Sequence, residues 1–576
     1  MSKKAELKRL IEDKVFIRNK DQQVSTHESP DAWIFDFRKL LMNGKASDLI
    51  TDLFYETFID RYPFQISALE IAGVPLATSI MNKFYAKGHH DINAFFIRKS
   101  RKKTGLMRMI EGEIQDTKKI ILVDDIINSG DSFWRQIEVL EALGYSVDTV
   151  WSILRFRKPE YYKRFALRNI KVESLFELND LTDALGNKVR NLDEKPEKPE
   201  LAMPFSVEWG FKSDNPTLAW VVPKSQPVID ESKLYFGSDN RTFWAINQAD
   251  GSVAWQYQVG RPSKKKSIFS NPALYHNTVI FGAYDGNVYC LDKETGKPKW
   301  IAMEADWVGS SPAVAPELGL VFIGLEYGIW GKYGAIIALN ADTGKPVWID
   351  RTHKGLTHCS PRYLPEHQQV VIGSNDGVVR LYDALSGDIA WTFTTFGGAS
   401  NSGTTINGFG EGDIKESFAF SPEHDFIIFG SMDGFVYILK RSTGHLVKHF
   451  KCDFGIYSTP YIYNDKVYFT STDKLVRCVD LNTLELIFEE NMDNTRLFSA
   501  PTVIKDKLYV GTNGARLYEL DPQTGEKLAY FQTLERITNT VIYNPKTDRY
   551  FLPTFANEIL ALSRNEVAET PKKTAE

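Results

Sequence analysis

The stretch IILVDDIINSGDS, Ile120–Ser132, decides the fold of the N-terminal part of the chain. Its apolar start, Ile120–Val123, predicts a buried central strand, and Asp124 and Asp125 follow at the carboxyl end of that strand. The chain then turns through the small polar residues Asn128–Ser132 into a predicted helix. Ligands of open α/β sheets bind at the carboxyl ends of the strands, and a helix start offers unpaired N–H groups. This order of residues therefore suits a phosphate carried by a polyol.

The following residues extend the strand into a strand–helix–strand unit. Phe133, Ile137 and Leu140 recur at helical spacing, and Gly144 is placed as a C-terminal cap. Residues 147–154 form a second apolar run. Two strands joined by a helix at this spacing predict a βαβ unit within a parallel sheet.

Composition sets the broad class of the protein. A chain of 576 residues is too long for one hydrophobic core. Its formal net charge of −5 offers no basic field, so nucleic-acid binding is not indicated. The charged N-terminus does not resemble a signal peptide, and no apolar run is long enough to span a membrane. We therefore expect a cytoplasmic protein that does not associate with membranes.

The second half of the chain is repetitive. VIFGAYDGNVYCLDKETGKPKW at 279–300 and VVIGSNDGVVRLYDALSGDIAW at 370–391 are two of eight copies, which recur at a period of roughly 40–57 residues. A tryptophan follows four residues after the turn glycine in several copies, at Gly251, Gly296, Gly344 and Gly387. Four short strands per period predict an all-β propeller, with eight blades as the preferred count and seven as the alternative.

The ends of the repeats predict how the ring closes and where the domains lie. The last copy lacks its final strand, and FSVEWGF at 205–211 resembles that strand. Pairing of these two segments would remove the exposed sheet edges. The predicted organisation is an α/β domain at 1–186, a linker rich in Lys, Glu and Pro at 187–204, the propeller at 205–565 and a polar tail at 566–576.

The acid pair and the loop after it resemble the phosphoribosyl-pyrophosphate motif of type I phosphoribosyltransferases. Three further segments resemble the orotate phosphoribosyltransferases. They are the N-terminal segment that ends in Phe35-Asp36-Phe37-Arg38, the pyrophosphate-loop region 68–80 with Gly73, and FFIRKSRKKTG at 95–105, which is similar to the start of a mobile catalytic loop. The resemblance covers about 180 residues. It implies a parallel sheet flanked by helices, and a homodimer through this domain.

The resemblance also implies roles for residues of this chain. Asp124 and Asp125 would hold the ribose hydroxyls and meet Mg²⁺ through its bound waters. The 5′-phosphate would lie on the substrate-binding set Asn128, Ser129, Gly130, Asp131 and Ser132, with Gly73 in the pyrophosphate loop. Arg98, Lys99 and Lys102 would neutralise the departing pyrophosphate. The implied reaction transfers ribose 5-phosphate from phosphoribosyl pyrophosphate to a nitrogen base, with an orotate-like pyrimidine preferred.

The repeats resemble the pyrroloquinoline quinone (PQQ) propeller family. Members that carry the quinone have an adjacent cysteine pair and a calcium site. The four cysteines here are far apart, so PQQ is not expected. A protein partner on the propeller is expected instead, with the insertions 260–267, 325–334 and 392–413 as its surface.

Two alternatives remain open at the level of sequence. The first is a catalytically weak or inactive domain that senses the ligand, with the propeller as its output. Asp131, whose carboxylate would repel a phosphate, and Asn128 favour this alternative. The second, more remote alternative is a quinone-dependent dehydrogenase.

Overall fold

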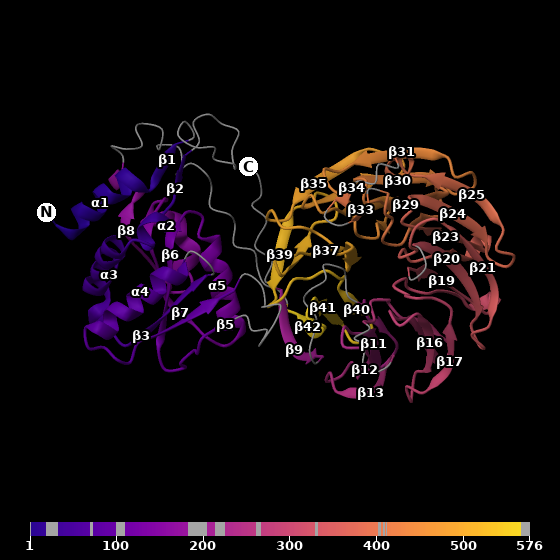
Figure 1. Cartoon of the computed structure of the whole chain (residues 1–576), viewed down its shortest axis with the longest axis horizontal. Coiled ribbons are helices and arrows are strands. Elements are labelled where there is room, and N and C mark those ends of the chain that lie inside the picture. The colour runs from indigo at the N-terminus through magenta and orange to yellow at the C-terminus, as the bar shows by residue number, and fades with distance from the viewer. Residues whose placement is uncertain are drawn as a thin grey trace, which may run out of the picture. The chain divides into compact units, whose positions relative to one another are not determined.

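The computed structural model describes residues 2–18, 33–69, 73–98, 110–181, 204–213, 225–260, 267–328, 332–400, 405–406, 409–410 and 412–565 (Figure 1). The chain divides into two compact units, Met1–Glu200 and Leu201–Glu576. None of the helices in the described ranges combines the length and the apolar character that a membrane crossing requires.

The N-terminal unit is an α/β fold built on a mixed, mostly parallel sheet (Figure 1). Its main helices are α1 (Lys3–Lys14), α2 (Arg38–Leu41), α3 (Gly44–Phe58), α4 (Gly73–Ala86), α5 (Asp131–Ala142) and α6 (Lys163–Ala166). Its strands are β1 (Phe16–Arg18), β2 (Trp33–Phe35), β3 (Phe64–Leu69), β4 (Asn93–Ile97), β5 (Ile110–Glu111), β6 (Lys119–Ile127), β7 (Val147–Arg155) and β8 (Lys171–Glu177).

Six of these strands form one sheet in the order β5-β4-β3-β6-β7-β8. Only the short edge strand β5 runs antiparallel to its neighbour. The predicted strand–helix–strand unit is confirmed as β6, α5 and β7, with Phe133, Ile137 and Leu140 buried under the sheet. Gly144 ends the helix in a left-handed conformation with φ 86°, as the sequence predicts.

The central strand is longer than its apolar run predicts. β6 continues through the acid pair to Ile127, because β7 goes on pairing with it as far as Ile127↔Arg155. Its other neighbour, β3, stops pairing at Ala68↔Val123. Asp124 and Asp125 therefore belong to the strand and project past the end of β3.

The C-terminal unit is a β-propeller of eight four-stranded sheets within the described residues, which confirms eight blades over seven (Figure 1). The first four blades are β10 (Val228–Ile229), β11 (Lys233–Gly237), β12 (Thr242–Asn247) and β13 (Val253–Gln258); β14 (Ala273–Tyr275), β15 (Thr278–Gly282), β16 (Asn287–Asp292) and β17 (Pro298–Met303); β18 (Ala313–Ala315), β19 (Leu320–Tyr327), β20 (Tyr333–Asn340) and β21 (Pro346–His353); and β22 (Arg362–Leu364), β23 (Gln369–Gly373), β24 (Val378–Asp383) and β25 (Ile389–Thr394).

The other four blades are β28 (Ala419–Ser421), β29 (Phe426–Gly430), β30 (Phe435–Lys440) and β31 (Leu446–Lys451); β32 (Tyr461–Tyr463), β33 (Lys466–Thr470), β34 (Leu475–Asp480) and β35 (Leu486–Asn491); β36 (Thr502–Ile504), β37 (Lys507–Gly511), β38 (Arg516–Leu520) and β39 (Lys527–Gln532); and β40 (Ile542–Asn544), β41 (Arg549–Thr554), β42 (Glu558–Arg564) and β9 (Phe205–Lys212). The first strand of each blade lies nearest the axis, and the fourth strand is outermost.

The ring closes as the sequence predicts. The first strand of the unit in chain order, β9, is the outermost strand of the last blade, and it pairs antiparallel with β42 from Arg564↔Phe205 to Glu558↔Lys212 (Figure 1). Polar side chains join the last and first blades as well, since the Asn544 Nδ2 donates to Gln248 Oε1 at 2.7 Å. Closure gives the last blade its fourth strand, so that it matches the other seven blades.

The tryptophan and the glycine of the repeat act on each other across neighbouring blades. Trp348 lies under Gly387 of the next blade, where a Cβ atom would lie 2.7 Å from the indole ring. Its Nε1 donates to the Ala384 carbonyl oxygen of that same blade at 2.9 Å. Gly387 also has φ 77°, a conformation that favours glycine. The same pairing joins Trp209, Trp255, Trp300 and Trp391 to Gly251, Gly296, Gly344 and Gly444.

The insertions proposed as a partner surface are described only in part. Residues 261–266, 329–331, 401–404, 407–408 and 411 lie outside the described residues. The longest insertion contributes α8 (Phe396–Ser400) and the short pair β26 (Thr405–Ile406) and β27 (Phe409–Gly410).

Candidate active site

The candidate site of the N-terminal unit lies at the carboxyl ends of the neighbouring strands β3 and β6. The next strand in sequence lies on one side of the sheet for β3 and on the other side for β6. β3 is bordered by β4 on one side and by β6 on the other, so the connections after β3 and β6 diverge. α4 starts after β3, and α5 starts after β6. A crevice between such connections is the usual ligand site of an open α/β sheet. Two helix starts with unpaired N–H groups border it here.

The acid pair of β6 lies at this edge of the sheet. Asp124 and Asp125 are both half-buried, and the Asp125 backbone N–H donates to Asp124 Oδ1 at 2.9 Å. Burial raises the pKa of the Asp125 carboxyl, while the hydrogen bond with Asp124 and the positive charge of Arg38 act in the opposite direction. Arg38 is itself held by Asp36, with Nε 2.7 Å from Oδ1.

The loop after the acid pair requires a glycine at its tightest point. Gly130 caps the start of α5 in a left-handed conformation with φ 80°. A Cβ atom there would lie 2.9 Å from ring carbons of Phe165. The Gly130 carbonyl oxygen accepts the first hydrogen bond of the helix, from the Trp134 N–H at 2.9 Å. Ser132 is exposed in the first turn of the helix.

The carbonyl groups of this loop are held from behind by the segment after β7. The Tyr162 hydroxyl donates to the Asn128 carbonyl oxygen at 2.8 Å, and Arg164 Nη2 donates to the Ser129 carbonyl oxygen at 2.6 Å. Burial raises the pKa of the Tyr162 hydroxyl, so that it remains a donor. With their carbonyls occupied on one side, successive peptide units can present N–H groups on the other, as anion-binding nests do.

A buried arginine borders the same loop. Arg157 is only 6% exposed, and its Nε donates to Asn128 Oδ1 at 3.1 Å. Its Nη1 is buried and has no hydrogen-bond partner among the described residues. A buried donor without a partner is costly, and an anionic ligand beside the loop would satisfy it.

The cationic residues of the predicted catalytic loop are described at only one position. Arg98 directly follows β4, at the same edge of the sheet as the acid pair, and its Nη1 lies 3.4 Å from Glu111 Oε1 on β5. β4 and β5 pair antiparallel, so they close the base of the loop 98–109. Lys99 and Lys102 lie outside the described residues, as does the side chain of Asp131, whose backbone begins α5.

Gly73 places the start of α4 tightly against the sheet. A Cβ atom at this position would lie 2.7 Å from Ala68 Cβ and 3.2 Å from the Val123 carbonyl oxygen, next to the acid pair. The structure thus places Asp124, Asp125, Gly73 and the 128–132 loop at the same edge of the sheet, beyond the carboxyl ends of β3 and β6.

The residues that sequence reasoning missed are Arg157, Tyr162 and Arg164. They follow β7 in the run RFRKPEYYKRF at 155–165. A signal was present, because cations and aromatics directly after a parallel strand lie at the ligand edge of the sheet.

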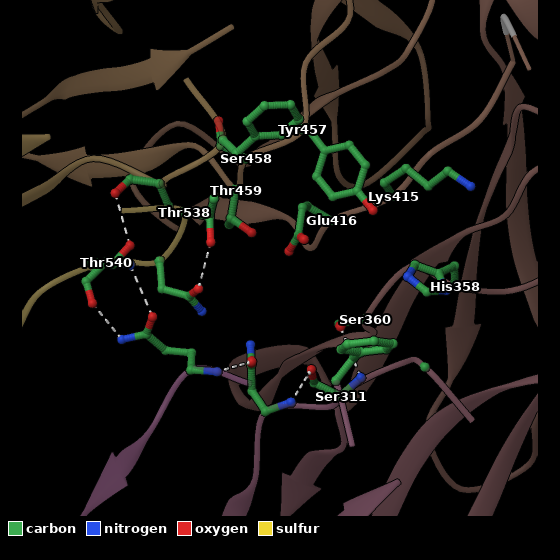
Figure 2. A pocket seen from close by; sticks show the side chains of 17 residues that line it. Ser311, His358, Ser360, Lys415, Glu416, Tyr457, Ser458, Thr459, Thr538 and Thr540 are labelled. Carbon is green, nitrogen blue, oxygen red and sulfur yellow. Dashed lines mark hydrogen bonds between the residues drawn. The ribbon is translucent and has the colours of Figure 1, made fainter. Parts of the chain in front are cut away.

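The axis of the propeller is a second place where a cofactor could be held. A cavity of about 120 Å³ lies there, lined among others by Lys415, Glu416 and Tyr457 (Figure 2). Glu416 has no cationic partner among the described residues. No group of three or more His, Cys, Asp or Glu that could bind a metal ion occurs in those residues. PQQ is a tricarboxylate. A cavity of about 120 Å³ that presents the Glu416 carboxylate and no metal-binding group among the described residues does not fit it.

Comparison with known proteins agrees with both halves of this description. The family described as outer membrane protein assembly factor BamB matches residues 206–306, 285–407 and 375–566, more than half of the chain. The N-terminal part is 30% identical over 187 residues to orotate phosphoribosyltransferase of a Bradyrhizobium strain, covering 31% of this chain and 99% of that protein.

Two further similarities concern the propeller. Quinoprotein alcohol dehydrogenase PedH of Pseudomonas putida is 34% identical over 140 residues, which cover 23% of each protein. The crystal structure of BamB from Moraxella catarrhalis superposes with a TM-score of 0.50 at 18% identity, covering 63% of this chain and 98% of that one. The chain therefore belongs to the orotate phosphoribosyltransferase family in its N-terminal unit and to the BamB-type propeller family in its C-terminal unit.

Proposed function

We propose that the N-terminal unit binds phosphoribosyl pyrophosphate and transfers its ribose 5-phosphate to a nitrogen base. The observation that carries this proposal is the acid pair Asp124–Asp125, placed beside a loop whose carbonyls are held from behind. Carboxylates suit the two ribose hydroxyls, and the N–H groups of the 128–132 loop suit the 5′-phosphate.

In the proposed reaction the bond between the anomeric carbon and the pyrophosphate oxygen breaks, and its electron pair leaves with pyrophosphate. A nitrogen lone pair of the base forms the new bond to the same carbon, and the proton carried by that nitrogen passes to the departing pyrophosphate or to solvent. The negative charge of Asp124 and Asp125 stabilises the positive sugar that develops between these events. Arg98, Lys99 and Lys102 neutralise the leaving group, and Gly73 lets the backbone approach it closely.

Magnesium fits this site through water rather than through a protein cage. The described residues offer the paired carboxylates of Asp124 and Asp125 but no group of three or more ligands that would enclose a metal ion. Mg²⁺ commonly keeps several waters and binds through one or two carboxylates together with substrate phosphates. When bound, it would neutralise charge on the pyrophosphate.

The buried Arg157 supports an anionic group at the 128–132 loop. Its unpartnered Nη1 lies in the guanidinium that holds Asn128 of that loop, where a phosphate would be favoured. An orotate-like pyrimidine is the acceptor that we propose over uracil or a purine, because the N-terminal part is 30% identical over 187 residues to an orotate phosphoribosyltransferase.

We propose a cytoplasmic homodimer that associates through the N-terminal domain at 1–186, a linker at 187–204, and a propeller at 205–565 that binds a protein partner through its rim insertions.

The experiment that tests the activity is a mass-spectrometric turnover assay of the full chain. Phosphoribosyl pyrophosphate and Mg²⁺ are incubated with orotate, uracil, adenine or hypoxanthine, and nucleotide and pyrophosphate are quantified. We expect both products with orotate. Asp124→Asn with Asp125→Asn is expected to lower turnover by about a hundredfold or more, whereas Asp60→Asn, an exposed acid on the same unit, leaves it unchanged.

The outcomes separate an enzyme from a sensor. Binding of phosphoribosyl pyrophosphate without turnover on any base, and loss of that binding in the double variant, would replace the proposed transfer by ligand sensing. Binding that survives in the double variant would show that Asp124 and Asp125 do not form the binding site.

A further inference from the structure

The axial cavity of the propeller is built from the residues just before the innermost strands. We name the cavity of about 120 Å³ the axial chamber. Side chains and backbone around it form a ring of hydrogen bonds from blade to blade. For example, the Asn271 N–H donates to Ser311 Oγ at 2.9 Å, and the Ser311 N–H donates to Ser360 Oγ at 3.0 Å (Figure 2). The first blade joins the last, because the Thr540 N–H donates to Gln226 Oε1 at 3.0 Å. These polar groups are occupied in holding the ring together.

Glu416 is different, because its carboxylate takes no part in this ring. Its side chain points into the chamber, whereas the neighbouring Lys415 extends away from it (Figure 2). Among the described residues the Glu416 carboxylate has no hydrogen-bond or ion-pair partner; only its backbone carbonyl oxygen is bonded, to the Cys359 thiol. Lys415 is already paired, with Nζ 2.8 Å from Asp413 Oδ2. Burial raises the pKa of the Glu416 carboxyl to about 8.

The other charged groups around the chamber leave an excess of negative charge. Glu326 is 3% exposed and accepts hydrogen bonds from the Gly309 N–H at 3.0 Å and from His358 Nδ1 at 3.2 Å. Three carboxylates, those of Glu326, Asp413 and Glu416, lie at or near the chamber, and Lys415 is already paired with Asp413. An anionic ligand is therefore disfavoured.

Aromatic rings complete the wall of the chamber. Tyr457 is 1% exposed and meets Phe498 edge to face at 5.7 Å between ring centroids. Phe269 lines the same chamber and meets Tyr284 at 5.2 Å. Burial raises the pKa of the Tyr457 hydroxyl, and the negative charges of Glu416, Asp413 and Glu326 raise it further. Aromatic faces attract organic cations, so this wall adds to the preference set by the carboxylates.

A second cavity adjoins the chamber. We name it the axial funnel; its volume is about 520 Å³, and it shares Asn271, Ser311, Ser360, Glu416 and Thr459 with the chamber. The rest of its wall combines apolar side chains, among them Pro272, Pro312, Val314, Pro361, Tyr363 and Pro365, with the charged side chains of Glu317 and Arg362. Glu416 thus lies at the junction of a small polar chamber and a wider funnel whose apolar side chains can contact an alkyl group.

We propose that the propeller axis binds a small primary alkylammonium compound, whose charged head pairs with Glu416 and whose alkyl chain lies in the axial funnel. This inference does not depend on the activity proposed for the N-terminal unit. An organic cation is preferred to a metal ion, because the described residues hold no group of three or more His, Cys, Asp or Glu that could bind one. A slender ligand is preferred to a bulky one, since the chamber has room for only a few non-hydrogen atoms.

The test uses isothermal titration calorimetry on the full chain at pH 9, in a buffer without amines, where Glu416 is ionised. The probes are n-butylammonium, 1-butanol and butyrate, which share a chain length and differ in charge. We expect binding of n-butylammonium only. Loss of the charge-assisted hydrogen bond in Glu416→Gln should weaken it by about tenfold or more. Glu423→Gln, an exposed acid in the same blade, should bind as the native protein does.

Several outcomes would overturn the proposal. Equal binding of 1-butanol would show an apolar site, and undiminished binding by Glu416→Gln would show that the carboxylate is not the partner. Binding of a lysine-containing peptide without binding of n-butylammonium would assign the axis to a protein partner instead. If Glu416→Gln does not fold, the three probes on the native chain still decide, because failure of the ammonium to bind more tightly than the alcohol refutes the inference.

Discussion

Replacing Glu416 by glutamine should stabilise the propeller, and the gain should grow with pH. The folded-state pKa of this carboxyl is raised from 4.5 to about 8 by burial. Between these two pH values the folded chain keeps a proton that the unfolded chain has lost. The free energy of unfolding therefore falls as pH rises through this window, because the folded state binds more protons. Glutamine carries no charge at any pH and removes this loss.

The size of the effect follows from the pKa difference. Each pH unit within the window costs about 1.4 kcal/mol, so the full window sets a ceiling of roughly 5 kcal/mol at pH 8. Glu416 is partly exposed, so solvent screens its charge and we expect about 2–4 kcal/mol. For a unit of this size, 1 kcal/mol corresponds to a shift in Tm of about 1.3 °C. Glu416→Gln should therefore raise the propeller Tm by about 3–5 °C at pH 8 and by about 1 °C or less at pH 4.5.

The assay is differential scanning calorimetry of the native chain, Glu416→Gln and Glu423→Gln between pH 4.5 and 8, in phosphate or acetate so that no amine occupies the axis. The other charged groups around the chamber, Asp413, Lys415, Glu326 and His358, are present in both proteins, so the difference between the two proteins reports on the Glu416 carboxyl. Glu423→Gln should follow the native curve. A difference between native chain and Glu416→Gln that stays constant with pH, or a variant less stable than the native chain at pH 8, would refute the reasoning.

Three further substitutions test the packing and the site. Gly130→Ala places a methyl group 2.9 Å from Phe165 at φ 80°. We expect it to destabilise the N-terminal unit by about 2–4 kcal/mol and to abolish phosphoribosyl-pyrophosphate binding, both measured by calorimetry. Unchanged binding would show that the loop does not need its present shape. Gly387→Ala and Gly319→Ala both place alanine at a positive φ, 77° and 63°. The new methyl group at Gly387 would lie 2.7 Å from the Trp348 indole of the preceding blade, whereas the one at Gly319 has nothing within 4 Å. Urea unfolding should give about 1 kcal/mol for Gly319→Ala and at least about 2 kcal/mol more for Gly387→Ala, and equal costs would disprove the role of the tryptophan. Arg164→Met frees a carbonyl of the phosphate loop and should weaken phosphoribosyl-pyrophosphate binding by about fivefold to tenfold with little change in Tm; a purely structural role would instead lower Tm and leave binding intact.

The sequence predicts those parts of the molecule that are encoded locally. The apolar run before the acid pair, the helical spacing of Phe133 and Ile137, and the strand-turn pattern of the repeats all reflect contacts between residues close in the chain. Ring closure by 205–211 could also be predicted, because an incomplete last copy needs a partner strand. Each of these features is confirmed by the structure.

The remaining features depend on contacts between distant segments. β6 runs on to Ile127 only because β7 continues beside it, and no property of Ile126 or Ile127 alone requires this. Tyr162 and Arg164 hold the phosphate loop from more than thirty residues away in sequence. Glu416 lies in an unremarkable polar stretch, and only the convergence of eight blades on one axis buries it.

The pairing of β9 with β42 also determines how the propeller responds to mechanical load. The pair begins at Phe205↔Arg564, and the Asn565 N–H donates to the Pro204 carbonyl oxygen just outside it, so both ends of the propeller leave from one corner. A force that pulls residues 204 and 565 apart loads the hydrogen bonds of this pair one at a time from that corner, rather than all together along the strands. The strand pair that closes the ring is therefore weakest against tension that separates residues 204 and 565.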